Sequence, residues 1–172
     1  MVRPIRSLLV LLMFCAAGMA VAQQPPVNAP LLDHLVGKWV LRGKIAGQDT
    51  THEVNAEWVL NHHYLLIHEV AREMNGEGEP RYQATIYIGW NEATKEYACV
   101  WLDDYGGLTS GSIGVASPKE NELPFIFNDE KGDVTFKNDF VYDTKAGTWE
   151  WRMDNVSKGA PIPFGRVKLA HN

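Results

Sequence analysis

The stretch DVTFKNDFVYDTKAGTWEWRMDNV, residues 133–156, contains the pattern that decides the fold. Two runs rich in β-branched and aromatic residues, 133–143 and 148–156, flank a short break of Lys, Ala and Gly. Within the second run, Trp149 and Trp151 are two positions apart, which places both on one face of an extended strand. The stretch therefore predicts two antiparallel β-strands joined by a tight turn, with an aromatic face to bury.

The same alternation of short strands and turns continues along the rest of the chain. Each break contains Gly, Pro, Asn or Asp, the residues that favour chain reversal. The connections are too short for the crossovers that parallel strands require, so the sheet should be antiparallel. Since about ten such strands leave exposed edges unless the sheet closes, we predict an all-β fold, a single antiparallel up-and-down barrel. The other eight predicted strands are Lys38–Ile45, Thr51–Leu60, Tyr64–Met74, Arg81–Trp90, Glu96–Leu102, Leu108–Val115, Glu122–Asn128 and Phe164–Ala170.

The N-terminus has the features of a secretory signal peptide. Arg3 and Arg6 precede an uncharged apolar run, and Ala20 and Ala22 supply the small residues that a signal peptidase accepts. We therefore predict that residues 1–22 are a signal peptide, cleaved after Ala22, and that the mature protein is periplasmic or secreted.

Cleavage would leave a chain of ordinary size for one domain. Residues 23–30 form a Pro-rich flexible leader, and 31–172 suffice for a single core. Because residues 1–22 carry two arginines and no acidic residue, their removal changes the formal net charge from −5 to −7. This acidic balance argues against nucleic-acid binding, which requires cations to neutralise phosphates. No second apolar run is long enough to span a membrane, and Cys99 has no partner for an internal disulfide.

The start of the first predicted strand carries a family resemblance. Residues 31–36 have the character of a short helix that ends at Gly37, and Gly37-Lys38-Trp39 follows the Gly-x-Trp pattern that opens lipocalins and other calycins. Similar segments recur in order along the chain: Leu35-Val36-Gly37-Lys38-Trp39, Trp58-Val59-Leu60-Asn61 with Tyr64-Leu65, Tyr87-Ile88-Gly89-Trp90-Asn91 with Thr94, and Trp101-Leu102-Asp103. With these segments the chain resembles the bacterial lipocalin-like DUF1579 domain family. The resemblance implies a calycin-like barrel and no established chemistry.

The resemblance also implies how one end of the barrel is closed. In calycins a basic side chain of the last strand often packs over the tryptophan of the Gly-x-Trp motif. Arg166 is the matching residue, with Lys168 second, so we expect Arg166 to cover Trp39 as a structural barrel plug. A guanidinium over an indole contributes about 0.5–2 kcal/mol.

The leading functional hypothesis is an exported protein that binds a small, mainly apolar ligand in the barrel lumen. It rests on the export signal, the aromatic strand faces and a sequence without recognised catalytic motifs. The residues nearest in type to a metal set, His52 and His68 with Glu69 or Glu53, lack close ligand spacing, so we assign no metal site, catalytic residue or cofactor. The predicted ligand-binding residues, with the arginine and aspartate as polar anchors, are Trp58, His68, Arg72, Tyr87, Trp101, Asp103, Phe140 and Trp151.

Three alternatives stay open at this stage. A haem-binding protein similar to nitrobindin would hold haem through a histidine near the C-terminus, where the sequence offers only His171. A barrel enzyme, an isomerase or cyclase, would use His68 with Asp103 as an acid–base pair on an enclosed lipophilic substrate. An interaction module would expose an aromatic patch on the outside of the barrel.

Overall fold

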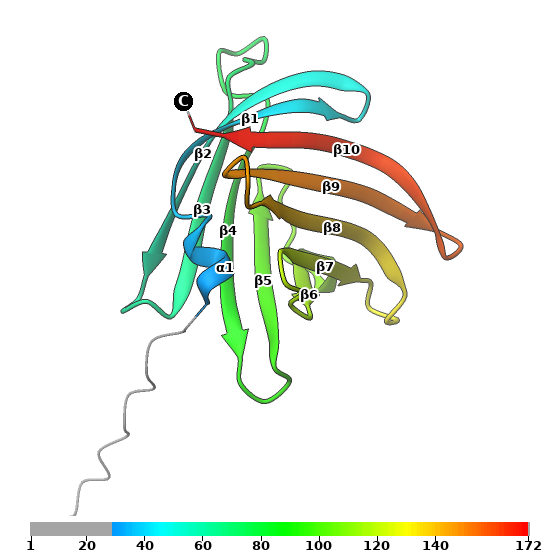
Figure 1. Ribbon diagram of the computed structural model, residues 1–172. Coiled ribbons are helices and arrows are strands. Elements are labelled where there is room, and N and C mark those ends of the chain that lie inside the picture. Colours follow the sequence, from blue (N-terminus) through cyan, green and yellow to red (C-terminus); the bar gives the residue numbers. More distant parts are fainter. Residues whose placement is uncertain (1–28, 172) are drawn as a thin grey trace, which may run out of the picture.

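Ten antiparallel strands form a closed barrel in the computed structural model, which describes residues 29–171. Each strand pairs with its neighbours in sequence, and β1 also pairs with β10, which closes the sheet (Figure 1). The predicted all-β, up-and-down barrel is therefore confirmed. The strands are β1 (Gly37–Ile45), β2 (Gln48–Val59), β3 (Tyr64–Ala71), β4 (Gln83–Asn91), β5 (Glu96–Asp103), β6 (Ile113–Ala116), β7 (Glu122–Asn128), β8 (Val134–Asp143), β9 (Thr148–Ser157) and β10 (Ala160–Ala170).

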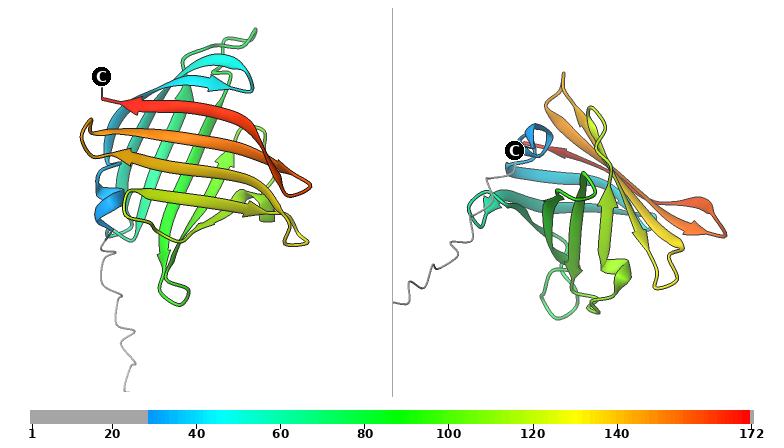
Figure 2. Two further views of the ribbon diagram at one scale, coloured as in Figure 1. Left: turned by 45° about the vertical axis from the view of Figure 1, so that its right-hand side comes forward. Right: turned by 90° about the horizontal axis from the view of Figure 1, so that it is seen from below.

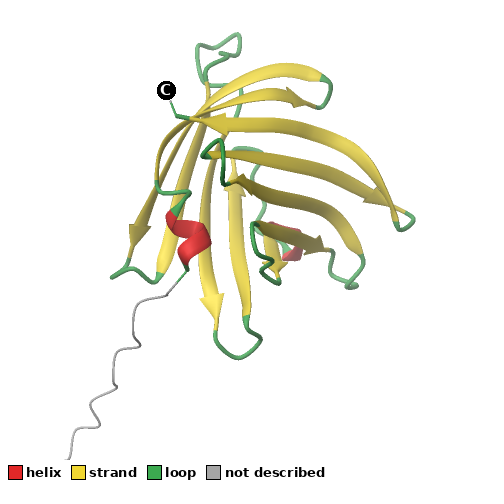
Figure 3. Cartoon of the chain, in the orientation of Figure 1, coloured by secondary structure: helices red, strands yellow, loops and turns green. Residues whose placement is uncertain are grey.

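Helical structure is sparse in the described part of the chain (Figure 3). The helix α1 (Pro30–Asp33) has proline in its first turn, where the missing N–H leaves no hydrogen bond unmade. A single 3₁₀ turn, η1 (Ser110–Ser112), lies between β5 and β6. The predicted signal peptide, residues 1–22, lies outside the described residues, as does most of the predicted leader. The end of that leader belongs to the domain, because Ala29 is buried in the core and Pro30 begins α1.

Two-residue turns join the longest hairpins. Ala46 and Gly47 connect β1 to β2, and Lys158 and Gly159 connect β9 to β10, with positive φ at all four residues. Positive φ at both central positions defines the type I′ turn, whose twist matches that of the paired strands. Because these turns are so short, β2 and β10 begin three and four residues earlier than the sequence predicts.

Large aromatic side chains fill the half of the lumen nearer α1. Trp149 and Trp151 lie on the inner face of β9, as their spacing predicts, and neither is exposed. Phe140 of β8 stacks on Trp151 with ring centroids 4.3 Å apart, and Phe125 of β7 meets Phe140 edge-on. This half of the barrel is therefore a packed core, which leaves only the other half for a cavity.

The segment before β1 covers the packed end, which we call the closed end (Figure 2). Leu32 and Leu35 are fully buried there. The indole N–H of Trp39 donates to the Leu35 carbonyl over 2.7 Å, and that of Trp149 donates to the His34 carbonyl over 3.1 Å. The helical segment is thus fastened to the first residues of two strands.

The sequence predicted that Arg166 covers Trp39, and this prediction is wrong. The register of β1 with β10 pairs Val40 with Ala170 and Lys44 with Arg166, so Arg166 lies four residue pairs away from the closed end. Its side chain points outward and bonds to Asp154 over 2.6 Å. The ring of His171 stacks on Trp39 instead, with centroids 3.8 Å apart. Arg166 therefore belongs to the outer wall and is no part of the plug.

The shortest strand, β6, differs most from expectation. The sequence predicts a strand over 108–115, but pairing begins only at Ile113, and the preceding residues form a loop with η1. Glycines at 106, 107 and 111 favour that loop because they weaken an extended strand. In the described chain, no helix has the length and apolar character of a membrane span.

Candidate functional site

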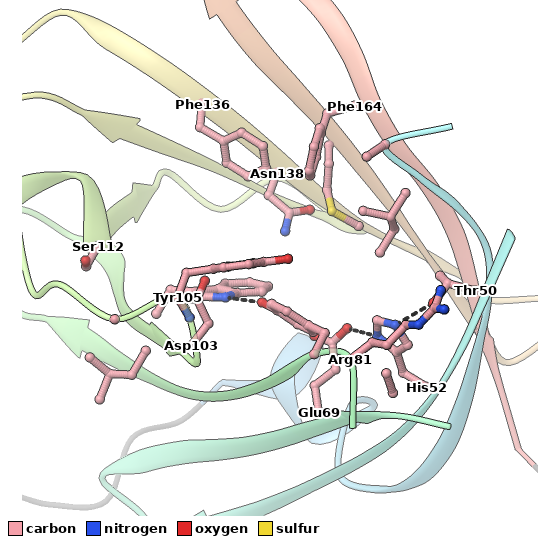
Figure 4. Close-up of a pocket in the computed structure, with 18 of the residues that line it drawn as sticks. Thr50, His52, Glu69, Arg81, Asp103, Tyr105, Ser112, Phe136, Asn138 and Phe164 are labelled. Carbon is pink, nitrogen blue, oxygen red and sulfur yellow. Dashed lines mark hydrogen bonds and ion pairs between the residues drawn. The ribbon is translucent and has the colours of Figure 1, made fainter. Parts of the chain in front are cut away.

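A cavity of about 720 Å³ occupies the half of the lumen that the aromatic core leaves free. It opens at the end opposite α1, bordered by the β1–β2 turn and by the loop between β5 and β6. One wall, from β7 to β10, is mainly apolar and presents Phe127, Phe136, Met153 and Phe164. The facing wall, from β2 and β3, is polar (Figure 4). The cavity therefore has one mainly apolar wall and one polar wall.

The polar wall holds a buried histidine between two other side chains. Nδ1 of His52 lies 2.5 Å from a carboxylate oxygen of Glu69, and Nε2 lies 2.7 Å from the hydroxyl of Thr50 (Figure 4). His52 and Glu69 are only 3% and 2% exposed. Strand register explains the pairing: His52 lies opposite Ala71, so Glu69 is its diagonal neighbour on the same inner face.

A second glutamate continues this polar wall toward the cavity mouth. Glu73 accepts a hydrogen bond from the backbone N–H of Thr51 over 2.9 Å and one from the hydroxyl of Thr50 over 3.3 Å. A chain of carboxylate, imidazole, hydroxyl and carboxylate thus runs along the wall from Glu69 to Glu73. Such a chain orients every polar group within it and can hold or pass a proton along its length.

Four buried side chains, those of Glu69, Asn128, Asn138 and Trp151, have polar atoms with no hydrogen-bond partner in the described residues. Two of them line the cavity: Glu69, through its second carboxylate oxygen, and Asn138, through both amide atoms. Asn138 lies on the apolar wall, on the inner face of β8 between Phe136 and Phe140, and its amide is directed into the cavity (Figure 4). Buried polar groups are nearly always paired in proteins, so these two are the clearest candidates for contact with a bound molecule.

Aromatic side chains form the floor between the two walls. The indole N–H of Trp101 donates to the hydroxyl of Tyr82 over 2.9 Å, and Trp101 meets Trp151 edge-on beneath the cavity. Burial and the nearby charge of Glu69 hold the pKa of Tyr82 well above its usual value of 10.0. Tyr105 lies near Tyr82, with ring centroids 6.0 Å apart, but is largely exposed in the β5–β6 loop. These rings give a ligand flat apolar surfaces close to polar groups.

Four of the eight predicted ligand-binding residues lie at or beneath this cavity. Trp101 and Asp103 line it, from the inner face of β5. Burial raises the pKa of the Asp103 carboxyl, although the backbone N–H of Tyr105 hydrogen-bonds to it. Trp151 and Phe140 do not line the cavity and instead form the packed layer below Trp101. The lumenal face of β5 therefore agrees with the grouping made from the sequence.

The other four predicted residues lie elsewhere, and the lining set is corrected accordingly. Trp58 is at the closed end, where its indole N–H donates to Asp33 over 2.8 Å. Tyr87 and His68 alternate with the buried residues of β4 and β3, and therefore face outward. Arg72 is exposed and forms an ion pair with Glu53 on the outer surface. Apolar residues occupy both faces of β3 and β4, so alternation alone did not identify the inner face.

These placements also test the residues on which two of the alternatives rested. His68 is on the outer face, where it contacts the hydroxyl of Thr85, whereas Asp103 faces the lumen, so the acid–base pair proposed for a barrel enzyme is wrong. His171 stacks on Trp39 at the closed end and does not line the cavity.

Within residues 29–171, no three His, Cys, Asp or Glu side chains gather closely enough to hold a metal ion. Burial raises the pKa of the Cys99 thiol to about 12, which keeps it protonated and a poor nucleophile.

Sequence reasoning missed the most informative residues of the cavity as ligand contacts, among them Asn138, Tyr82 and the pair of His52 and Glu69. A signal for the pair was present. Both residues continue a two-residue apolar period, Ala56 and Val54 toward His52, and Leu65 and Ile67 toward Glu69. A polar residue in the inward period of a strand is a candidate for a lumenal site.

Comparisons with known proteins add no relative to this picture. No family model matches the chain, and a search of curated proteins found no match.

Proposed function

We propose that this chain is an exported, lipocalin-like binding protein that holds one small, mainly apolar molecule in its barrel lumen. The observation that carries the proposal is the cavity of about 720 Å³, open at one end and closed by packed aromatic residues at the other. Its volume falls within the range of about 300–1,000 Å³ typical of small-molecule sites. Most of the side chains that form the floor of the cavity and its wall from β7 to β10 are aromatic or aliphatic, which suits a ligand whose body is apolar.

The proposed export rests on the sequence of residues 1–22, and the proposed family on the resemblance to the DUF1579 domain proteins. Both stay predictions. N-terminal sequencing of protein from the periplasm or medium should begin at Gln23, because Ala20 and Ala22 flank the expected cut. A chain that still begins at Met1 would contradict export by this signal.

Binding in the lumen is tested with N-phenylnaphthylamine, a neutral apolar dye that fluoresces when it leaves water. We expect the purified protein to bind one dye molecule. Met153 lines the cavity, so Met153→Trp should fill part of it and weaken dye binding by about tenfold, or about 1.4 kcal/mol. The matched control is Arg152→Trp, the same new side chain on the outer face of the same strand, which should leave dye affinity unchanged.

The melting temperature of each variant shows whether the barrel still folds, because overpacking a lumen costs about 1–3 kcal/mol. Equal dye affinity of folded Met153→Trp and wild-type protein would place the binding site outside the lumen. Separately, solvent extraction of protein from its natural source, followed by mass spectrometry, should identify the compound that the protein binds.

A further inference from the structure

Carboxylates outnumber basic groups in the lining of the cavity. Four carboxylates, from Asp49, Glu69, Glu73 and Asp103, line it together with one guanidinium, from Arg81, and the imidazole of His52, which is bonded to Glu69. Three of the four are engaged: Asp49 with Lys44 over 2.9 Å, Glu73 with Thr50 and Thr51, and Asp103 with the Tyr105 N–H. The fourth, Glu69, is the most deeply buried and keeps one oxygen without a partner in the described residues.

Burial makes this free oxygen significant. A carboxylate removed from water loses hydration that only hydrogen-bond donors or a cation can replace. His52 supplies one donor to Glu69, at Oε1, and the other oxygen remains to accept from a bound molecule. Burial is the main cause of the raised pKa of Tyr82, and the charges of Glu69, Asp103 and Asp104 add to it.

We propose that the ligand of this cavity is an amine, protonated at neutral pH and attached to an aromatic or similarly flat apolar body, with Glu69 as its counter-ion. This inference rests on the proposed binding function and names the chemical class of the ligand. The ammonium group donates to the free oxygen of Glu69. The apolar body lies against the rings of Tyr82 and Trp101, whose faces also attract cations.

Asn138 adds a second polar contact from the facing wall. Within residues 29–171 neither the donor nor the acceptor of its amide has a hydrogen-bond partner, and the residue is 1% exposed. A ligand that reaches from the polar wall across the lumen can therefore offer a second hydrogen-bonding group to the apolar side. This arrangement selects against a plain hydrocarbon, which would leave both buried polar groups unpaired.

The test compares three probes with the same aromatic body: naphthylethylamine, naphthylethanol and naphthylacetate, which are cationic, neutral and anionic at pH 7. Each displaces N-phenylnaphthylamine from the wild-type protein in a competition titration. We expect the amine to bind about tenfold more tightly than the alcohol, and the carboxylate to bind most weakly. Equal affinity of amine and alcohol, or tightest binding of the carboxylate, would overturn the inference.

The outcomes separate this inference from the function on which it rests. If the protein binds the dye or the alcohol but does not prefer the amine, the proposed binding in the lumen is retained and the proposed amine ligand is contradicted. A protein that binds neither the dye nor any of the three probes contradicts both proposals. Because this ranking uses the unaltered protein, it decides the question even where a variant does not fold.

Glu69→Gln then tests the counter-ion, since it removes the charge and keeps a side chain of the same shape. We expect the tenfold preference for the amine over the alcohol to disappear in this variant. The matched control is Glu53→Gln, the same charge removal on the outer face of β2, where Glu53 lies opposite Val70 in the register. An unchanged amine preference in folded Glu69→Gln would exclude Glu69 as the counter-ion.

Discussion

At the closed end of the barrel, three indole N–H groups find partners inside the protein, whereas two buried side chains that line the cavity at the open end have polar atoms that do not. The indole N–H of Trp151, in the packed layer below the cavity, also lacks a partner in the described residues. The indoles of Trp39, Trp149 and Trp58 donate to Leu35, His34 and Asp33, so the helical segment and three strands are tied together. At the open end, Glu69 and Asn138 keep atoms that nothing in the described chain satisfies.

The difference shows how one barrel divides stability and recognition between its ends. A satisfied hydrogen bond contributes about 0.5–1.5 kcal/mol to folding, whereas a buried polar group without a partner costs about 1–3 kcal/mol. The closed end therefore contributes to the stability of the free protein, and the open end reduces it. Groups that destabilise the free protein but gain partners from a ligand favour binding of a ligand that matches them.

The largest expected effect comes from breaking the closed end at Trp39. Trp39→Ala removes a 2%-exposed indole, its hydrogen bond to Leu35 and its stack with His171. Truncations of this kind cost about 3–5 kcal/mol, a large share of the stability of an ordinary domain. Urea unfolding should show the loss, while N-phenylnaphthylamine affinity in the folded fraction stays near that of wild type. Normal stability together with lost dye binding would move Trp39 into the binding site.

Asn138→Leu, at the open end, should raise the stability of the free protein, whereas Trp39→Ala lowers it. The substitution replaces a buried amide that has no partner in the described part of the chain with an apolar side chain of similar size, so the free protein should gain about 1–3 kcal/mol in unfolding free energy. Its affinity for a ligand that hydrogen-bonds to the amide should fall. A suitable control is Asn55→Leu, on β2 but outside the set of cavity-lining residues. Destabilisation by Asn138→Leu would mean that the amide is satisfied in the free protein.

Alkaline pH should weaken the open end through Tyr82. Its pKa in the folded protein lies above the ordinary 10.0, so its contribution to stability is complete below pH 10 and is lost as pH rises above that value. Tyr82→Phe should cost about 0.5–1.5 kcal/mol at pH 7, because the Trp101 N–H loses its acceptor, and should then lose less stability than wild type above pH 10. Urea unfolding at several pH values measures both effects. Parallel losses in the two proteins would contradict this role of Tyr82.

The smallest effect distinguishes the two residues that could cover Trp39. His171→Ala removes an exposed stacking partner and should cost no more than about 1 kcal/mol, with a shift in tryptophan emission because the Trp39 indole becomes more exposed. Arg166→Ala breaks an outer-wall ion pair with Asp154 and hydrogen bonds to the carbonyls of Met153 and Gly165, and should cost about 1 kcal/mol without moving the emission. An emission shift in Arg166→Ala alone would restore the expected calycin arrangement.

Local pattern was enough to predict the strands, the turns and the barrel. The two-residue period of β5 and β9 placed Trp101 with Asp103, and Trp149 with Trp151, on shared faces, and the structure keeps both groupings. Short connections excluded parallel pairing, and the number of strands made closure the way to satisfy the sheet edges. These properties depend on residues close together in the chain, so the sequence alone determined them.

Only the tertiary structure decided which face of each strand is inside and where the lumen is hollow. In β3 and β4 both faces carry apolar residues, so a shift by one position would have exchanged His68 for Glu69 and Tyr87 for Ile86. The register of β1 with β10 placed His171, and not Arg166, beside Trp39. Pairing between residues distant in the chain sets the register, and the total volume of the inward side chains sets the cavity. Neither quantity is contained in any local stretch of sequence.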